Sequence, residues 1–352
     1  MTPKFSLAGT AVMLMLFTAL AVCHSNVKAS HDAAVKPADD DVAAPQIAGP
    51  APSTITTASY VALGTEVYNA LQSVNSFSGT PVPGLEEADD DVPAPNPARQ
   101  AIDLLMFAIS GETPSGDARQ STCSLGGTAD RVASRQQAAR FSPGDRISLV
   151  LSDCQLNAGT RPLSGKAVFT FRQIDGVVSV GQPWHAAVDV QFHELAAAYS
   201  GHAIVGNGDL SVDIRQAGQG ERIVRVHSAR LSEETRSGLA VGIQLAPAAH
   251  TYSNYQAVET QEGSRSAWDV SFGLTSRNGY FYTSEYAVNT MQPMVFDGGK
   301  APVSGKVKVT GKDSSVTLTM LEGEMVRLDL SENDDGIVSQ STFLPSSRLL
   351  AE

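Results

Sequence analysis

The chain has 352 residues, of which 42% are hydrophobic and 6% aromatic, so it can bury one sizeable core built mainly from Val, Leu, Ile and Ala. It carries 37 acidic against 25 basic side chains, which gives a formal net charge of -12. Such a charge repels nucleic-acid phosphates, and the composition therefore predicts no nucleic-acid partner.

Residues 1–22 resemble an export signal. An apolar run, Leu7–Val22, is too short to span a bilayer comfortably. It leads into the tetrapeptide Leu-Ala-Val-Cys, which is similar to a bacterial lipobox, although Val22 replaces the small residue that is usual at that position. In a lipobox, Cys23 would be diacylated and become the first residue of the mature protein.

Cysteine counting favours lipidation over two alternatives, which are ordinary signal-peptidase cuts after Ala21 or Ala29. Lipidation of Cys23 leaves an even pair in the body of the chain, whereas a cut after Ala21 leaves an unpaired thiol in an oxidising compartment. His24 follows Cys23, which by resemblance to bacterial lipoprotein sorting favours the outer membrane. We therefore expect an outer-membrane lipoprotein that faces the periplasm or the exterior, and otherwise a periplasmic or secreted protein.

Residues 23–57 are predicted to form a disordered acidic tether. Ala, Pro, Asp and Ser dominate this segment, so burial of apolar surface cannot offset the entropy lost on ordering. An acidic run, Ala38–Pro45, recurs in similar form at Ala88–Pro95. Pro and Ala beside the aspartates provide no closed loop that could gather cation ligands, so we interpret both runs as solvated spacers.

Two short helices with an acidic linker are predicted within residues 58–113. In the first helix, apolar side chains at three- and four-residue steps share one face: Tyr60, Leu63, Val67, Leu71 and Val74. The second helix begins with Asn96 as N-cap and Pro97 at the first helical position, and it stops before Gly111. We expect both helices to pack on the β region that follows.

From residue 114 to 346 the apolar period changes to two, which is the spacing of half-buried antiparallel strands. Asn278-Gly279 is a strong hairpin signal between two such runs. The sequence therefore predicts a mainly β fold. It would be a large antiparallel meander, as an open sheet or a half-barrel-like domain, preceded by two short helices and a disordered N-terminal tether.

Cys123 and Cys154 are the only cysteines beyond the export segment. Each lies on or beside a strand-like run, and an even pair in an exported protein predicts a disulfide. This bridge would pin the start of the β region.

Several structural motifs follow one another along the body of the chain: Cys123 with Gly126-Gly127, Ser142 to Asp145 leading into Cys154, Leu163 to Gly165, a closing meander from Pro302 to Leu330, and Asp334 to Gly336. In these motifs, over roughly the last two thirds of its length, the chain resembles a loose group of exported β-rich bacterial proteins. Many of those proteins are predicted lipoproteins without an assigned function. The resemblance implies no particular activity.

No constellation of catalytic or metal-ligating residues stands out in the sequence. Four histidines fall in successive strand-like runs, but none has the i, i+2 or i, i+4 spacing of a metal pair: His185, His193, His202 and His227. No Gly-x-Ser-x-Gly elbow occurs in the body of the chain. We predict no catalytic residue, no metal and no cofactor. A pocket in which a Ser or an Asp is hydrogen-bonded to a His would instead favour an enzyme.

One region concentrates aromatic side chains: Tyr252, Tyr255, Tyr280, Phe281, Tyr282 and Tyr286. Alternating tyrosines on a hairpin could stack on sugars or contact a partner, which makes Tyr280, Tyr282 and Tyr286 candidate binding residues. Aromatic pairs across strands usually serve packing, and packing is the favoured interpretation.

The sequence as a whole predicts an exported, lipid-anchored envelope protein that acts as a structural or binding module and not as an enzyme. Its contact with the membrane would be the lipid on Cys23. One alternative is a glycan- or partner-binding protein that uses the Tyr280 hairpin. The other is an extracytoplasmic hydrolase with a site assembled across loops.

Overall fold

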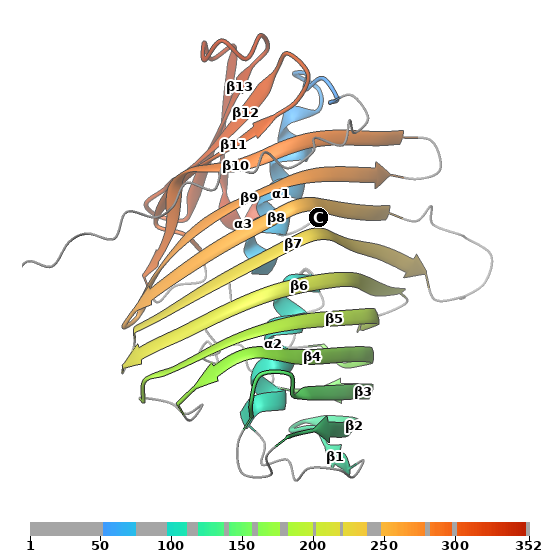
Figure 1. Ribbon diagram of the computed structural model, residues 1–352. Coiled ribbons are helices and arrows are strands. Elements are labelled where there is room, and N and C mark those ends of the chain that lie inside the picture. Colours follow the sequence, from blue (N-terminus) through green and yellow to red (C-terminus); the bar gives the residue numbers. More distant parts are fainter. Residues whose placement is uncertain are drawn as a thin grey trace, which may run out of the picture. The chain divides into compact units, whose positions relative to one another are not determined.

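In the described part of the chain, fourteen antiparallel strands form one sheet, and each strand pairs with its neighbours in the sequence (Figure 1). The computed structural model describes residues 52–74, 97–110, 119–136, 141–156, 161–176, 182–199, 202–218, 221–237, 248–278, 282–297 and 301–349. All of these residues belong to one unit, Gly49–Glu352. The predicted mainly β fold with an open antiparallel meander is confirmed.

The central strands of the sheet are long and the edge strands are short. The strands are β1 (Arg119–Thr122), β2 (Gly126–Ser134), β3 (Arg146–Gln155), β4 (Leu163–Asp175), β5 (Trp184–Tyr199), β6 (His202–Gly218), β7 (Glu221–Ser237), β8 (Ala248–Glu262), β9 (Arg265–Asn278), β10 (Tyr282–Asp297), β11 (Ser304–Thr310), β12 (Ser315–Leu321), β13 (Met325–Ser331) and β14 (Gln340–Pro345). β6 and β7 have 17 residues each, whereas the edge strands β1 and β14 have 4 and 6. Short edges expose few unpaired backbone groups, which limits pairing with other chains.

The alternation in the sequence sorts side chains onto two faces of the sheet. In β11, Val307 and Val309 are fully buried, while Lys306 and Lys308 alternate with them and are partly exposed. Successive side chains of a strand point to opposite faces, and the apolar sets of β2 to β14 all join the same core. These side chains and the helices form one hydrophobic core.

Helices cover the apolar face of the sheet. α1 (Tyr60–Val74) contacts β12 and β13, and α2 (Pro97–Ser110) contacts β4 to β7. Figure 1 shows both helices on the same side of the sheet. A short third helix, α3 (Ser346–Leu349), follows β14 and contacts α1. The two helices predicted from the sequence are confirmed. The side chain of Val74 lies outside the described residues. The other four side chains predicted to share a face of α1 are buried: Tyr60, Leu63, Val67 and Leu71.

A buried arginine from the sheet holds the carboxyl end of α2. Nη2 of Arg131, on β2, donates to the carbonyl oxygens of Phe107 and Ala108. These carbonyls belong to the last turn of the helix, where no further helical N–H is available and where the helix dipole favours a positive charge. The Arg131 guanidinium also lies 5.7 Å from the centroid of the Phe107 ring. This contact ties the end of α2 to β2.

β-Bulges interrupt the strands where a glycine faces a residue with positive φ on the next strand. Glu194 in β5 has a φ of 49°, and the register with both neighbouring strands shifts there. Gly165 of β4, with a φ of 128°, lies so close that a Cβ on it would overlap the carbonyl oxygen of Glu194. Asp153 of β3 and Gly127 of β2 repeat this arrangement. Glycine is needed here because the bulged strand occupies the space of a side chain.

A disulfide joins Cys123, which follows β1, to Cys154 in β3, as the sequence predicts. The two Cα atoms are 5.4 Å apart, and both cysteines are buried. The bridge ties the turn between β1 and β2 to β3, so it secures one edge of the sheet. The long central strands are held by their own hydrogen-bond ladders and by the core.

Removal of the bridge should destabilise the protein without changing its topology. For a sequence separation of 31 residues, the chain-entropy model predicts that the Cys123→Ala/Cys154→Ala variant loses about 3 to 4 kcal/mol of unfolding free energy. Equilibrium urea unfolding of the variant and of the oxidised wild type measures this loss. A loss below about 1 kcal/mol would show that the first three strands are ordered without the bridge.

A side chain at a bulge glycine should be far more costly than one at an open position. Gly165→Ala forces a Cβ against the Glu194 carbonyl at a positive φ, so we expect a loss of about 2 kcal/mol or more. Gly218→Ala, at the end of β6, is the matched control because a Cβ there meets nothing within 4 Å, and it should change stability by less than about 0.5 kcal/mol. Equal urea midpoints for the two variants would contradict the packing of this bulge.

Candidate functional site

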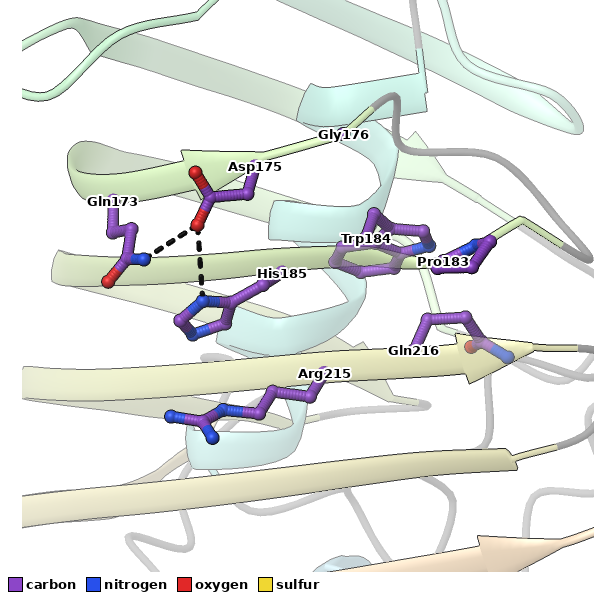
Figure 2. Close-up of a pocket in the computed structure, with 8 residues that line it drawn as sticks. All are labelled: Gln173, Asp175, Gly176, Pro183, Trp184, His185, Arg215 and Gln216. Atoms are coloured by element: carbon purple, nitrogen blue, oxygen red, sulfur yellow. Dashed lines mark hydrogen bonds and ion pairs between the residues drawn. The ribbon is translucent and has the colours of Figure 1, made fainter. Parts of the chain in front are cut away.

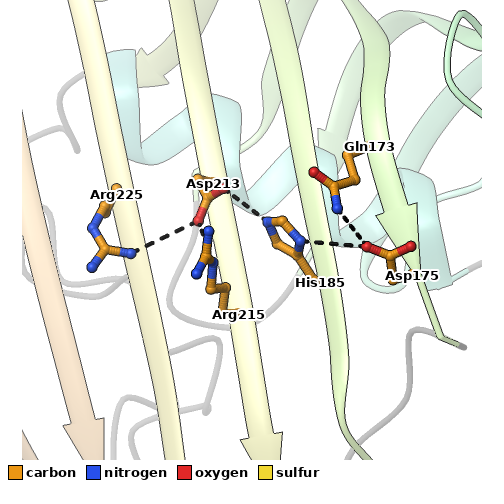
Figure 3. A network of polar contacts seen from close by, with 6 residues as sticks. All are labelled: Gln173, Asp175, His185, Asp213, Arg215 and Arg225. Atoms are coloured by element: carbon orange, nitrogen blue, oxygen red, sulfur yellow. Dashed lines mark hydrogen bonds and ion pairs between the residues drawn. The ribbon is translucent and has the colours of Figure 1, made fainter. Parts of the chain in front are cut away.

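An array of ionisable side chains crosses four strands on the outer face of the sheet, opposite the helices (Figure 3). Asp175 of β4 stands opposite His185 of β5, and His185 stands opposite Arg215 of β6. Asp213 of β6 stands opposite Arg225 of β7. Side chains directly opposite or diagonal on one face of an antiparallel pair lie within contact distance. The strand register therefore assembles this array from four separate segments.

His185 lies between two carboxylates. Its Nε2 is 2.8 Å from Oδ2 of Asp213, and its Nδ1 is 3.6 Å from Oδ2 of Asp175. Because both ring nitrogens face carboxylates, neither is directed at a hydroxyl group that could act as a nucleophile.

Asp213 also orients two arginines. Its Oδ1 accepts a hydrogen bond from Nε of Arg215 at 3.2 Å and lies 3.9 Å from Nη1 of Arg225. The two arginine side chains are 59% and 50% exposed, so much of each guanidinium faces water. One carboxylate thus holds two planar hydrogen-bond donors that remain accessible to a ligand.

A hollow opens beside the array (Figure 2). It has a volume of about 580 Å³, and its lining includes Gln173, Asp175, Pro183, Trp184, Arg215 and Gln216. Nε2 of Gln173 donates to Oδ2 of Asp175 at 2.6 Å, so these two side chains are fixed relative to each other. Trp184 is only 6% exposed, so little of its ring is available to a ligand. The exposed surface of the hollow is divided almost evenly between polar and apolar atoms.

A second polar cluster, which we call the clamp, ties α1 to the covered face of the sheet. It consists of Glu66 on α1, Glu233 on β7, and His250 and Tyr252 on β8. Nε2 of His250 is 2.9 Å from Oε1 of Glu66, and its Nδ1 is 2.6 Å from Oε1 of Glu233. The Tyr252 hydroxyl donates to the same Glu233 oxygen at 2.9 Å.

The charges of the clamp stabilise one another. Burial by itself lowers the pKa of His250, but hydrogen bonds and charges from Glu233 and Glu66 outweigh burial and raise this pKa to about 10. Burial raises the pKa of Glu66, yet the hydrogen bond and charge of His250 bring it below its usual value. Burial and the charge of Glu233 raise the pKa of Tyr252 well above its usual value. The clamp is therefore an ionised link between helix and sheet at neutral pH.

The predicted tyrosine site is only partly described by the structure. Tyr280 and the side chain of Tyr282 lie outside the described residues. Tyr286 of β10 packs partly against the hydrophobic core. Tyr252 and Tyr255 are fully buried, with ring centroids 6.4 Å apart in an edge-to-face contact. The described tyrosines of this region therefore serve packing.

Among the three histidines of the sequence prediction whose side chains the structure describes, His185 joins a charge network with carboxylates on both sides. His193 and His227 are exposed, and Nδ1 of His193 is 2.9 Å from Oδ1 of Asn207. In the described strands, no histidine stands opposite another. The described residues contain no group of three or more His, Cys, Asp or Glu side chains that could hold a metal ion. The proposed lipidation residue, Cys23, lies outside the described part of the chain.

Sequence reasoning named His185 but missed Asp175, Asp213 and the two arginines. These charged residues occupy alternate strand positions, and any such residue in an amphipathic strand is expected on the solvated face. The acidic-basic alternation of Asp213 and Arg215 was the available signal. Only the register shows which charges on neighbouring strands meet.

No known protein family, characterised protein or solved structure matches this chain. Within the residues that the structure describes, no helix combines the length and apolar character needed to cross a bilayer.

The clamp predicts a pH-dependent contribution to stability. Folding raises the pKa of His250 from 6.5 to about 10. The contribution of the protonated ring to the unfolding free energy is therefore complete below pH 6.5 and is lost as the pH rises through about 10. His250→Gln should therefore cost about 2 kcal/mol or more at pH 6 and much less at pH 10.5. Urea unfolding of wild type and variant at both pH values measures the difference.

The exposed His227 provides the matched control for this experiment. His227→Gln should leave the unfolding free energy within about 0.5 kcal/mol of wild type at both pH values. If His250→Gln cost the same at pH 6 and at pH 10.5, the histidine would not be held as a cation by the two glutamates.

Proposed function

We propose that the protein is an exported envelope protein, anchored through a lipid on Cys23, that binds a ligand at the outer face of its sheet. The disulfide between Cys123 and Cys154 supports an extracytoplasmic location, because such bridges persist in oxidising compartments. The apolar N-terminal run that leads into Leu-Ala-Val-Cys supports the lipid anchor. Under this proposal the sheet faces the periplasm or the exterior from the outer membrane.

The binding role is carried by one observation, which is the ordered charge array beside the hollow. Asp213 holds His185, Arg215 and Arg225, and the arginines keep exposed N–H groups. Exposed ion pairs contribute only about 0 to 1 kcal/mol each, so fold stability gives little reason for this arrangement. A few oriented polar groups at a concave surface are what ligand recognition requires.

The geometry of His185 favours binding over hydrolysis. An Asp hydrogen-bonded to a His beside a hollow is the feature that would point to an enzyme, and Asp213 and His185 provide it. A general base, however, needs a ring nitrogen free to take a proton from a hydroxyl or a water. Asp175 faces the second nitrogen at 3.6 Å, so His185 is better arranged to orient its neighbours than to activate a nucleophile.

The lipid anchor can be tested on the full chain expressed in a bacterial host. We expect a mature protein that begins with an acylated Cys23 and sediments with membranes, because two or more acyl chains are needed for stable anchoring. Cys23→Ala removes the sulfur that carries the lipid, so this variant should leave the membrane fraction. Intact-mass measurement of the mature protein and membrane fractionation provide the two readouts.

Two results would contradict the anchor. A mature chain that begins at Val22 or Ser30 would show an ordinary signal-peptidase cut. Release of the wild-type protein from membranes by carbonate or high salt would show a peripheral association. Cys123→Ala/Cys154→Ala controls for the loss of cysteine as such, because it lacks the bridge but keeps Cys23.

A further inference from the structure

We propose that the hollow beside Asp175, His185 and Arg215 binds an uncharged oligosaccharide. This inference rests on the proposed binding function of the outer face and names its class of ligand. It replaces the Tyr280 hairpin as the candidate glycan site, and it uses residues from β4, β5 and β6.

The hollow offers a mixture of hydrogen-bonding groups. Gln216 stands opposite Trp184, so strand alternation places its amide on the other face of β6 from Arg215. On the outer face, Gln173 carries a planar amide, Asp175 an acceptor and Arg215 a fork of donors. A sugar hydroxyl both donates and accepts, so a saccharide can use such neighbouring groups together. Gln173 and Asp175 are already joined at 2.6 Å, and Arg215 is held by Asp213, so little side-chain entropy is lost when a ligand binds.

The formal charges of the array balance. It contains two aspartates and two arginines, and both arginines contact Asp213, so the charges of these four side chains cancel. The chain as a whole carries a formal net charge of -12, which repels anions that approach from a distance. An anionic polymer is therefore disfavoured, while a neutral ligand meets no electrostatic penalty.

The shape and the apolar surface of the hollow also suit a saccharide. The hollow is open to solvent at the ends of β4 and β6 and the start of β5, so an extended chain can enter and leave it without a lid. Pro183 is exposed there, next to the largely buried Trp184, and offers apolar surface for the C–H groups of a sugar ring. These contacts are few, so we expect a low affinity for the few sugar units that the hollow contacts.

The test uses three uncharged hexasaccharides that differ in linkage and substituents: maltohexaose, cellohexaose and chitohexaose. Their binding to the full mature protein is measured in detergent. The charged probe is hexagalacturonate. Ligand-observed NMR titration gives the dissociation constants. We expect at least one uncharged hexasaccharide to bind more tightly than hexagalacturonate.

The site variant is Gln173→Ala/Arg215→Ala, which removes an amide and a guanidinium from the lining. Loss of hydrogen bonds that include a charged donor should weaken binding by about tenfold or more. Gln191→Ala/Arg277→Ala is the matched control, because it removes one exposed glutamine and one exposed arginine from the outer face outside the hollow lining. Both variants should keep the wild-type urea midpoint.

Three results would overturn the proposal. These are no binding of any uncharged hexasaccharide, tighter binding of hexagalacturonate, or equal weakening by the site variant and the control variant. The membrane fractionation of Cys23→Ala is independent of these titrations. A protein that is membrane-anchored but binds no hexasaccharide would therefore contradict the ligand class and leave the envelope location standing.

Discussion

Burial of one apolar face of a wide sheet is the constraint on which the rest of the structure depends. A single sheet layer cannot exclude water from its own face, so the alternating side chains of the strands need a second layer. α1 and α2 supply it over different strands, β12 and β13 for α1 and β4 to β7 for α2. Gly64 lets α1 approach the sheet closely, because a Cβ there would lie 2.9 Å from Cδ1 of Leu328. The helices are thus structural partners of the sheet and not an appended module.

The polar groups on the covered face follow from the same constraint. A charge taken out of water is tolerated only when partners replace the lost hydration. Glu66, Glu233, His250 and Tyr252 do this for one another, and in doing so they connect α1 to β7 and β8. Arg131 meets the same requirement at the end of α2, where its guanidinium satisfies helix carbonyls. The helix layer is therefore located by specific polar contacts as well as by apolar packing.

The outer face is free of this requirement, and the candidate site lies there. Because its side chains remain hydrated, charged residues can be placed on it at little cost in stability. Four neighbouring strands each contribute a charged or ionisable side chain to the array around Asp213, and the hollow beside it adds the amide of Gln173 and apolar surface. Under the proposed function the fold separates its tasks, with stability on the helix side and recognition on the solvated side.

Much of the fold could be predicted from the sequence, because its signals are local. The step of three and four residues in Tyr60 to Leu71 specifies a helix, and Asn96-Pro97 marks where the next one begins. The alternation in β11 to β13 specifies strands and the face that each buries. The pairing of Cys123 with Cys154 followed from a count of cysteines.

The candidate site was not predictable in the same way. The tertiary structure alone decided that Asp213 meets His185 and Arg225, that Glu66 reaches His250, and that Glu194 bulges against Gly165. These contacts depend on strand register and on the placement of a helix, which bring together residues far apart in the chain. Local periodicity states which face a side chain occupies, but a shift of two residues in register leaves that face unchanged while it replaces every neighbour across the strand.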